Sequence, residues 1–217
     1  MNKELLLKAG TATVSDALDM LNINNGLGSA INPLRFGMQC VGPAFTIQVE
    51  AVQPGESGKA ADYIDDVAAG EVIVIANRGV TESTVWGDIL SRLAVRKGIA
   101  GTVIDGACRD ADGIATSGHP VFARAAYMKS GKGRTMLKAI NVPVKIGETT
   151  VAPGDIVCAD SSGVVVIPQD KLAQVEKLVS EIITMETEVE ALVEQGMALK
   201  EAREKLNYNR YGLKIPS

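Results

Sequence analysis

Histidine is almost absent from this chain of 217 residues, which contains only His119, and aromatic residues make up 4% of it. One imidazole cannot build a histidine-based zinc site, and a Ser-His-Asp triad accompanied by a second, metal-binding histidine is excluded for the same reason. A lone histidine before a strand is more often structural. If His119 instead lines a pocket, it would change which substrate the protein accepts.

Cysteine is also scarce. Cys40, Cys108 and Cys158 are an odd number without a CxxC spacing. Cys40 and Cys158 fall in strand-like segments, where thiols behave as small hydrophobic side chains. This usage indicates a reducing, cytoplasmic setting.

Runs of one charge sign and long apolar runs are both missing. The net charge is −4 and the pI about 5.2, and no run rich in lysine or arginine occurs, so we expect no nucleic-acid or membrane-surface partner. The apolar run at residues 5–7 is too short for a secretory signal, and no stretch approaches the length of a membrane span. The sequence therefore predicts a soluble protein.

Hydrophobic residues make up 46% of the chain, and the length fits one α/β domain over residues 1–217, with residues 170–206 as a helical appendage. Thr13 or Ser15 is available to cap the second N-terminal helix. Helices are predicted near residues 2–9, 14–21, 60–69, 87–97, 110–116 and 170–194, followed by a final short one. Strands are predicted near residues 38–51, 71–76, 100–105, 120–124, 142–146, 149–151, 155–159 and 163–167.

The stretch WGDILSRLAVRKGIAGTVIDGACRD, residues 86–110, organises the rest. A short helix opens at Gly87 and ends at Gly98, and a buried β-branched strand follows. The turn after that strand places Arg109 beside Asp110. Because ligands gather at the carboxyl ends of strands in open α/β sheets, we expect the site here.

The residue types indicate what this site could bind. The backbone N–H groups at the helix start, from Gly87 through Asp88 and Ile89 to Leu90, favour a carboxylate or phosphate. The guanidinium of Arg109 can clamp a carboxylate or polarise a carbonyl. Asp88 and Asp110 would form a hard-oxygen site for Mg²⁺ or Mn²⁺. Together these groups could hold a 2-oxo acid and stabilise its enolate.

Other interpretations of the same residues remain open. An Arg-Asp pair after a strand is also a common surface ion pair or helix cap, and Asp88 is a good first-turn residue in any helix. Residues 127–134, YMKSGKGR, could cradle an anion or form a plain surface turn. The lysines lie in polar or terminal segments, so no Schiff-base lysine is indicated.

Asp88, twenty intervening residues and then Arg109-Asp110 resemble the D-x20-R-D signature of the class II pyruvate aldolases. These are typified by 4-hydroxy-4-methyl-2-oxoglutarate/4-carboxy-4-hydroxy-2-oxoadipate aldolase and share a fold with the RraA regulators of ribonuclease E. The resemblance extends over further segments, namely TATVSDAL at 11–18, VGPAFT at 41–46, PVFAR at 120–124, VPV at 142–144, VAPGD at 151–155 and ADSSGVVVIP at 159–168.

The resemblance implies an RraA-like α/β sandwich with a swivelling-domain-like β core and a long C-terminal helix. It also implies trimers or hexamers with sites at protomer interfaces, and Mg²⁺ or Mn²⁺ held near Asp110. In the aldolases, a glutamate from the neighbouring protomer reaches the metal site, and counting back from Gly196 gives Glu186. The lysine that usually precedes it is Met185 here.

Two hypotheses of different classes follow. The first is a divalent-metal-dependent aldolase that cleaves a 4-hydroxy-2-oxo acid to pyruvate and decarboxylates oxaloacetate through the same enolate. In it, Arg109 and Asp88 are catalytic. The second is a non-catalytic RraA-like regulator that binds and inhibits a ribonuclease. The Arg-Asp pair fits both hypotheses, whereas Asp88 favours the aldolase.

Overall fold

A computed structural model describes residues 1–53 and 62–208. Its helices are α1 (Lys3–Asp19), α2 (Asp88–Lys97), α3 (Ala111–Ser117), α4 (Leu172–Glu194) and α5 (Leu199–Lys205), with 3-10 turns η1 (Asp62–Asp66) and η2 (Gln169–Lys171). Its strands are β1 (Asn32–Pro33), β2 (Cys40–Ala51), β3 (Val72–Trp86), β4 (Gly101–Cys108), β5 (Val121–Ala126), β6 (Thr135–Ile140), β7 (Val144–Ile146), β8 (Thr149–Val151), β9 (Ile156–Asp160) and β10 (Gly163–Ile167). No helix in these two ranges is both long and apolar enough to cross a membrane.

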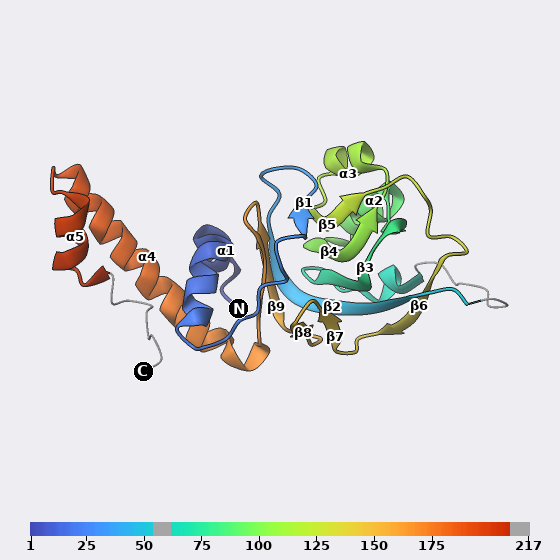
Figure 1. The fold of residues 1–217 in the computed structure, drawn as a ribbon, viewed down its shortest axis with the longest axis horizontal. Helices are drawn as coiled ribbons and strands as arrows, with labels where there is room; N and C mark the ends of the chain where they lie inside the picture. Colours follow the sequence, from blue (N-terminus) through green and yellow to red (C-terminus); the bar gives the residue numbers. More distant parts are fainter. Residues whose placement is uncertain (54–61, 209–217) are drawn as a thin grey trace.

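One large sheet dominates the molecule, with strand order β1-β5-β4-β3-β2-β9-β10 and β6 paired to β2 (Figure 1). Strands β2, β3, β4 and β5 are parallel, whereas β9 and β10 run antiparallel. Strand β2 joins the two parts, because its residues Cys40 to Pro43 pair with β9 and its residues from Ala44 onward pair with β3. The expected α/β sandwich is therefore confirmed.

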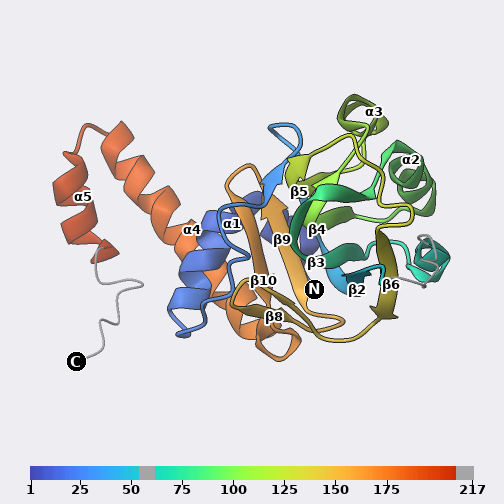
Figure 2. The same ribbon diagram turned by 45° about the vertical axis from the view of Figure 1, so that its right-hand side comes forward.

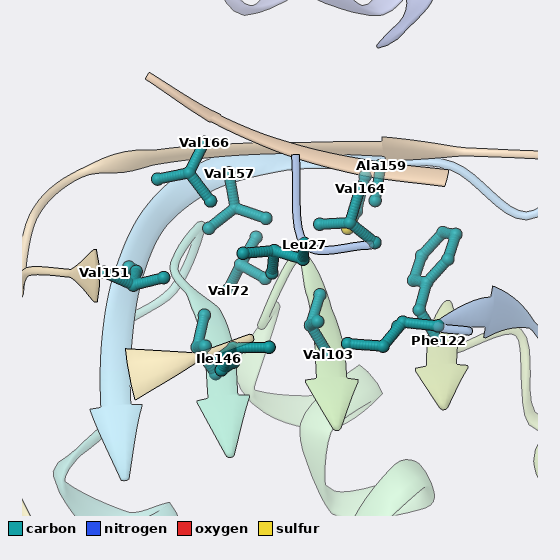
Figure 3. Close-up of a cluster of buried hydrophobic side chains, with 14 of the residues drawn as sticks. Leu27, Val72, Val103, Phe122, Ile146, Val151, Val157, Ala159, Val164 and Val166 are labelled. Carbon is teal, nitrogen blue, oxygen red and sulfur yellow. The ribbon is translucent and has the colours of Figure 1, made fainter. Parts of the chain in front are cut away.

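Three apolar clusters separate the layers. One fills the space between the parallel strands and β9–β10, where Val72, Val103 and Phe122 face Val157 and Val166 (Figure 3). A second lies on the other face of the parallel strands, beneath α2 and α3. The third packs α1 and α4 on the outer face of β9 and β10. All three cysteines are free and buried in these layers.

The N-terminal helices are continuous except at Gly10, whose φ of 74° breaks the helical path. The prediction of two helices is confirmed, but the predicted cap at Thr13 or Ser15 is wrong. The second helix is capped from β9, since the Asp160 carboxylate accepts bonds from the Thr11 amide and hydroxyl, each 2.7 Å long. A cap supplied by tertiary contact leaves no local signal in the sequence.

Helices α4 and α5 extend away from the sheet, with α4 packed along α1 (Figures 1 and 2). Two sheet predictions need correction. Strand β3 continues to Trp86 instead of ending near Ala76, and β6 was not predicted. Of the helix predicted at 60–69, residues 60–61 lie outside the described residues, and the following segment holds only the short turn η1.

Candidate active site

The residues singled out by the sequence begin at the ends of two neighbouring strands. Trp86 at the end of β3 pairs with Cys108 at the end of β4, and the Arg109 amide donates a 3.0 Å bond to the Trp86 carbonyl. Gly87 then starts α2 directly, and Asp110 starts α3. The fold therefore brings both halves of the D-x20-R-D motif together at the carboxyl edge of the parallel strands.

The carboxylate of Asp110 faces the start of α2. Its backbone is left-handed, with φ 56° and ψ 42°, a conformation that aspartate tolerates better than most residues. Oδ2 lies 3.3 Å from the Arg109 Nε and would lie 2.9 Å from a Cβ added at Gly87. Glycine at position 87 thus leaves the space in which this carboxylate sits.

Asp88 lies near Asp110, which is among the groups that influence its pKa. The hydrogen bond from Arg92, 2.7 Å from Nη1 to Oδ2, is the main cause that lowers the pKa of Asp88 below its ordinary value. Gly113 lets α3 lie close to Asp88 of α2, because a Cβ at position 113 would be only 2.9 Å from the Asp88 Cβ. Asp88 is therefore held ionised at neutral pH.

These groups border one cavity of about 550 Å³. Its wall includes Gly87, Asp88, Ile89, Leu90, Arg109 and Asp110, together with the apolar Val49, Tyr63, Trp86, Met136 and Leu137. Every candidate site residue from β3, α2 and the turn after β4 thus borders a single space that has both charged and apolar walls.

Comparison with known proteins decides the family. The family model described as RraA-like, Aldolase/RraA, matches residues 11–166, more than half of the chain. The chain belongs to the RraA-like family.

Its relatives carry different names. A protein from Halalkalibacterium halodurans named "Putative 4-hydroxy-4-methyl-2-oxoglutarate aldolase" is 34% identical over 90% of each chain. Protein DlpA of Legionella pneumophila is 41% identical over 97% of this chain but only 34% of its own length, so the chain spans about a third of that relative.

Solved structures share the RraA-like fold. An uncharacterised protein from Pseudomonas syringae pv. tomato superimposes with a TM-score of 0.86 at 40% identity, covering 93% of this chain and 94% of the other. Streptomyces coelicolor RraAS2, described as an unusual member of the RNase ES inhibitor RraA family, gives 0.78 at 29% identity, covering 89% and 96%. The family predicted from the motif is confirmed, and its members include both named aldolases and named inhibitors.

Glu186 is not brought into this cavity within one protomer. It lies on α4, on the opposite side of the RraA-like fold from α2 and α3 (Figure 1), and its carboxylate accepts a 3.3 Å bond from the Tyr208 hydroxyl. Its predicted reach into a neighbouring protomer stays a prediction.

The sequence left one part of the wall undecided. Ser130, Gly131, Lys132 and Gly133 line the cavity, where the 127–134 segment crosses β3 at Thr84. A Cβ at Gly131 would lie only 2.1 Å from the Thr84 carbonyl oxygen, so glycine is required for this crossing. The two glycines flanking a lysine were the available signal. Met136 and Leu137 were missed because they belong to β6.

His119 lies behind the cavity wall rather than in it. Its Nε2 is 2.8 Å from the Thr102 hydroxyl, and its ring stacks on Trp86. Burial lowers the pKa of His119 to about 4, so the imidazole is neutral at neutral pH. It supports the wall without contacting the cavity.

The donor set is compatible with a hard divalent cation. Asp88 and Asp110 offer two adjacent carboxylates, and within residues 1–53 and 62–208 no cluster of three or more metal-ligating side chains occurs. Mg²⁺ is commonly held by one or two carboxylates while it keeps several waters. Two carboxylates beside open space in the cavity suit such a hydrated ion better than they suit zinc.

Proposed function

We propose that this RraA-like protein is a lyase dependent on Mg²⁺ or Mn²⁺. It would cleave a 4-hydroxy-2-oxo acid of the 4-hydroxy-4-methyl-2-oxoglutarate type to pyruvate. The observation that carries the proposal is the convergence of Asp88, Arg109, Asp110 and the start of α2 on one cavity. The names of several relatives support the same reaction class.

Substrate binding follows from the start of α2. The backbone N–H groups between Gly87 and Leu90 precede the first complete helical turn, and the helix dipole adds to their attraction for an anion. They bind the carboxylate of the 2-oxo acid. Ile89 and Leu90 line the cavity at the same point. Arg109 lies beside Gly87, since a Cβ added there would be 3.7 Å from the Arg109 Nε, and its guanidinium can donate to the 2-oxo oxygen.

The divalent ion would be held by Asp110, with Asp88 beside it and Glu186 contributed by a neighbouring protomer of a trimer or hexamer. When bound, it supplies Lewis-acid polarisation of the 2-oxo acid. Arg109 stabilises the negative charge that develops on the enolate oxygen. The ionised Asp88 accepts the proton of the C4 hydroxyl, directly or through water, as the C3–C4 bond breaks. The C4 fragment leaves as a carbonyl compound, which is a second pyruvate for 4-hydroxy-4-methyl-2-oxoglutarate. The pyruvate enolate then takes a proton at C3, from Asp88 or from water, and is released as pyruvate.

Oxaloacetate is the natural second substrate of such a site. Loss of its C4 carboxylate as CO₂ leaves the same pyruvate enolate, so the same charge stabilisation by Arg109 applies. Oxaloacetate decarboxylase activity is therefore part of the proposal. Oxaloacetate has no C4 hydroxyl group, so this reaction does not need Asp88 to accept a proton.

The second candidate is a non-catalytic regulator that binds a ribonuclease, favoured by the similarity to RraAS2. The test is pyruvate release, coupled to lactate dehydrogenase, from oxaloacetate and from 4-hydroxy-4-methyl-2-oxoglutarate, with Mg²⁺ or with EDTA. Asp110→Ala should abolish metal-dependent pyruvate, whereas Asp112→Ala, an exposed acid two residues further on, should not. No turnover of either compound with any divalent ion would favour the regulator, and a ribonuclease pull-down would follow.

A further inference from the structure

A second cavity, of about 630 Å³, lies on the other face of the parallel strands. Its lining includes Arg78, Asp105, Arg124 and Lys145, and it shares no lining residue with the candidate active site. Side chains alternate between the two faces of a strand. On β4 and β5, Ile104 and Ala123 belong to the cluster beneath α2 and α3, so their neighbours Asp105 and Arg124 face the opposite way.

The centre of this cavity is a fixed guanidinium. Arg124 Nε bonds Asp105 Oδ1 at 2.5 Å, and the Asp105 side chain is only 4% exposed. The Gly79 amide donates to the other carboxylate oxygen at 3.1 Å, so both oxygens of Asp105 accept a hydrogen bond. In the described part of the chain, no hydrogen bond to a protein acceptor is found for the Arg124 Nη atoms. Its remaining donors are thus free for a ligand at the cavity.

A local irregularity of β3 brings a second cation to the same place. The β3–β4 ladder shifts register between Ala76 and Val80, so that Asp105 and Gly106, adjacent on β4, pair with residues four apart on β3. The looped-out residues include Arg78, with a left-handed φ of 52°, and Gly79, against which the Arg124 guanidinium packs. The extra residues therefore place Arg78 at the rim of the cavity.

The charge balance at the cavity is positive. Arg78, Arg124 and Lys145 line it against the single carboxylate of Asp105. Arg78 and Lys145 also contact Glu50 and Glu148, but their side chains are 72% and 63% exposed and the contacts are 3.3 and 3.4 Å long. Exposed pairs of this kind contribute little, so both cations can turn toward an anion.

We propose that this cavity is a second binding site, for a small oxyanion bearing a phosphate or carboxylate group. A guanidinium held rigid by a buried carboxylate presents parallel N–H donors that match either group, and two mobile cations at the rim neutralise the remaining charge. The site is independent of the proposed lyase reaction, because none of its residues borders the first cavity.

The test is calorimetric titration of the full chain with inorganic phosphate and, separately, with malonate. In the double variant Arg78→Gln/Lys145→Gln both changes are at exposed side chains, so the fold should persist. Affinity should fall about tenfold or more, because the two cations that neutralise the bound anion at the rim are lost. Lys138→Gln is the matched control, because this lysine also contacts Glu50 yet lies outside the cavity, and its affinity should be unchanged.

Two controls distinguish anion binding at the second cavity from anion binding at the first. Trp86 is the only tryptophan of the chain and lines that cavity, so anion binding at the second site should leave its fluorescence unchanged. Anion binding at the second site should also persist in the Arg109→Ala variant. Of phosphate and malonate, the one that binds the wild-type chain and binds the double variant more weakly identifies whether the site recognises a phosphate or a carboxylate group. The proposal is overturned if neither anion binds, or if binding is lost in Arg109→Ala and unaffected by the double variant.

Discussion

The imidazole of His119 stacks on the indole of Trp86, with ring centroids 5.8 Å apart and planes inclined by 25°. The indole Nε1 donates to the Ser91 hydroxyl at 2.8 Å, and that hydroxyl donates to the Gly87 carbonyl. His119 therefore supports, through Trp86 and Ser91, the helix start proposed to bind the substrate carboxylate. It is a positioning residue, and its burial gives it a measurable pH signature.

The first prediction concerns that signature. The pKa of His119 falls from 6.5 to about 4 on folding because the imidazole is buried. Below pH 6.5 His119 is protonated in the unfolded chain, whereas in the folded chain it stays neutral until about pH 4. The free energy of unfolding therefore falls as the pH decreases from 6.5 to 4. Between pH 7 and 4.5 the loss should be roughly 2.5 kcal/mol. Urea unfolding of wild type and His119→Phe at both pH values measures it, and equal losses in the two proteins would contradict the assignment.

A second prediction concerns the charge state of Asp88. Arg92→Gln replaces the charged donor of the hydrogen bond that is the main cause of the lowered pKa of Asp88 with a shorter, neutral one, so this pKa should rise. If Asp88 acts as the base, the acid limb of the kcat/KM profile for aldol cleavage should move to higher pH. Arg96→Gln, at the other end of α2, is the control and should leave the profile in place. An unmoved acid limb in Arg92→Gln would remove Asp88 from the role of base.

A third prediction tests the space beside Asp110. Gly87 is extended, with φ −157° and ψ −175°, so alanine causes no backbone strain there, but its Cβ would crowd Asp110 Oδ2 at 2.9 Å. Gly87→Ala should displace this carboxylate and weaken Mn²⁺ binding, measured by electron paramagnetic resonance, by about 10- to 100-fold. Gly26→Ala, whose Cβ would meet nothing within 4 Å, should bind Mn²⁺ normally. Unchanged affinity in Gly87→Ala would place the ion elsewhere.

A fourth prediction concerns stability. Arg124→Ala would leave Asp105 buried without its ion-pair partner, which typically costs about 3–5 kcal/mol. Arg78→Ala removes only an exposed pair and should change the free energy of unfolding by less than about 1 kcal/mol. Chemical unfolding of both variants measures the difference. Adding Asp105→Asn to Arg124→Ala should recover part of the loss, and no recovery would mean that packing, rather than charge, dominates.

The elements around the motif could be predicted from the sequence because their signals are local. Helix α2 has an apolar face and a left-handed glycine cap at Gly98, and β4 is a short β-branched run buried along its whole length. The D-x20-R-D spacing then placed Asp88 near Asp110, since a helix and a strand lie between them. Metal binding and the role of Glu186 are still predictions.

The missed features depend on partners far away in the chain. The Asp160 cap lies 149 residues from Thr11. Strand β6 exists because it pairs with the later half of β2, and this pairing carries Met136 and Leu137 to the cavity. The end of β3 was misplaced because Asn77-Arg78-Gly79 resembles a turn, whereas the strand loops out these residues and resumes its pairing at Val80. Periodicity within a window detects none of these long-range contacts.

The three buried thiols can report which part of the fold opens first by local unfolding. Burial raises the pKa of Cys40 to about 12 and that of Cys108 to about 11, and alkylating reagents attack thiolates, so modification waits for transient exposure. Cys108 ends β4 beside the candidate active site, whereas Cys40 and Cys158 lie on the adjacent strands β2 and β9. Their relative labelling rates therefore distinguish loosening of the α2–α3 layer from separation of β9 from the sheet, without any engineered probe.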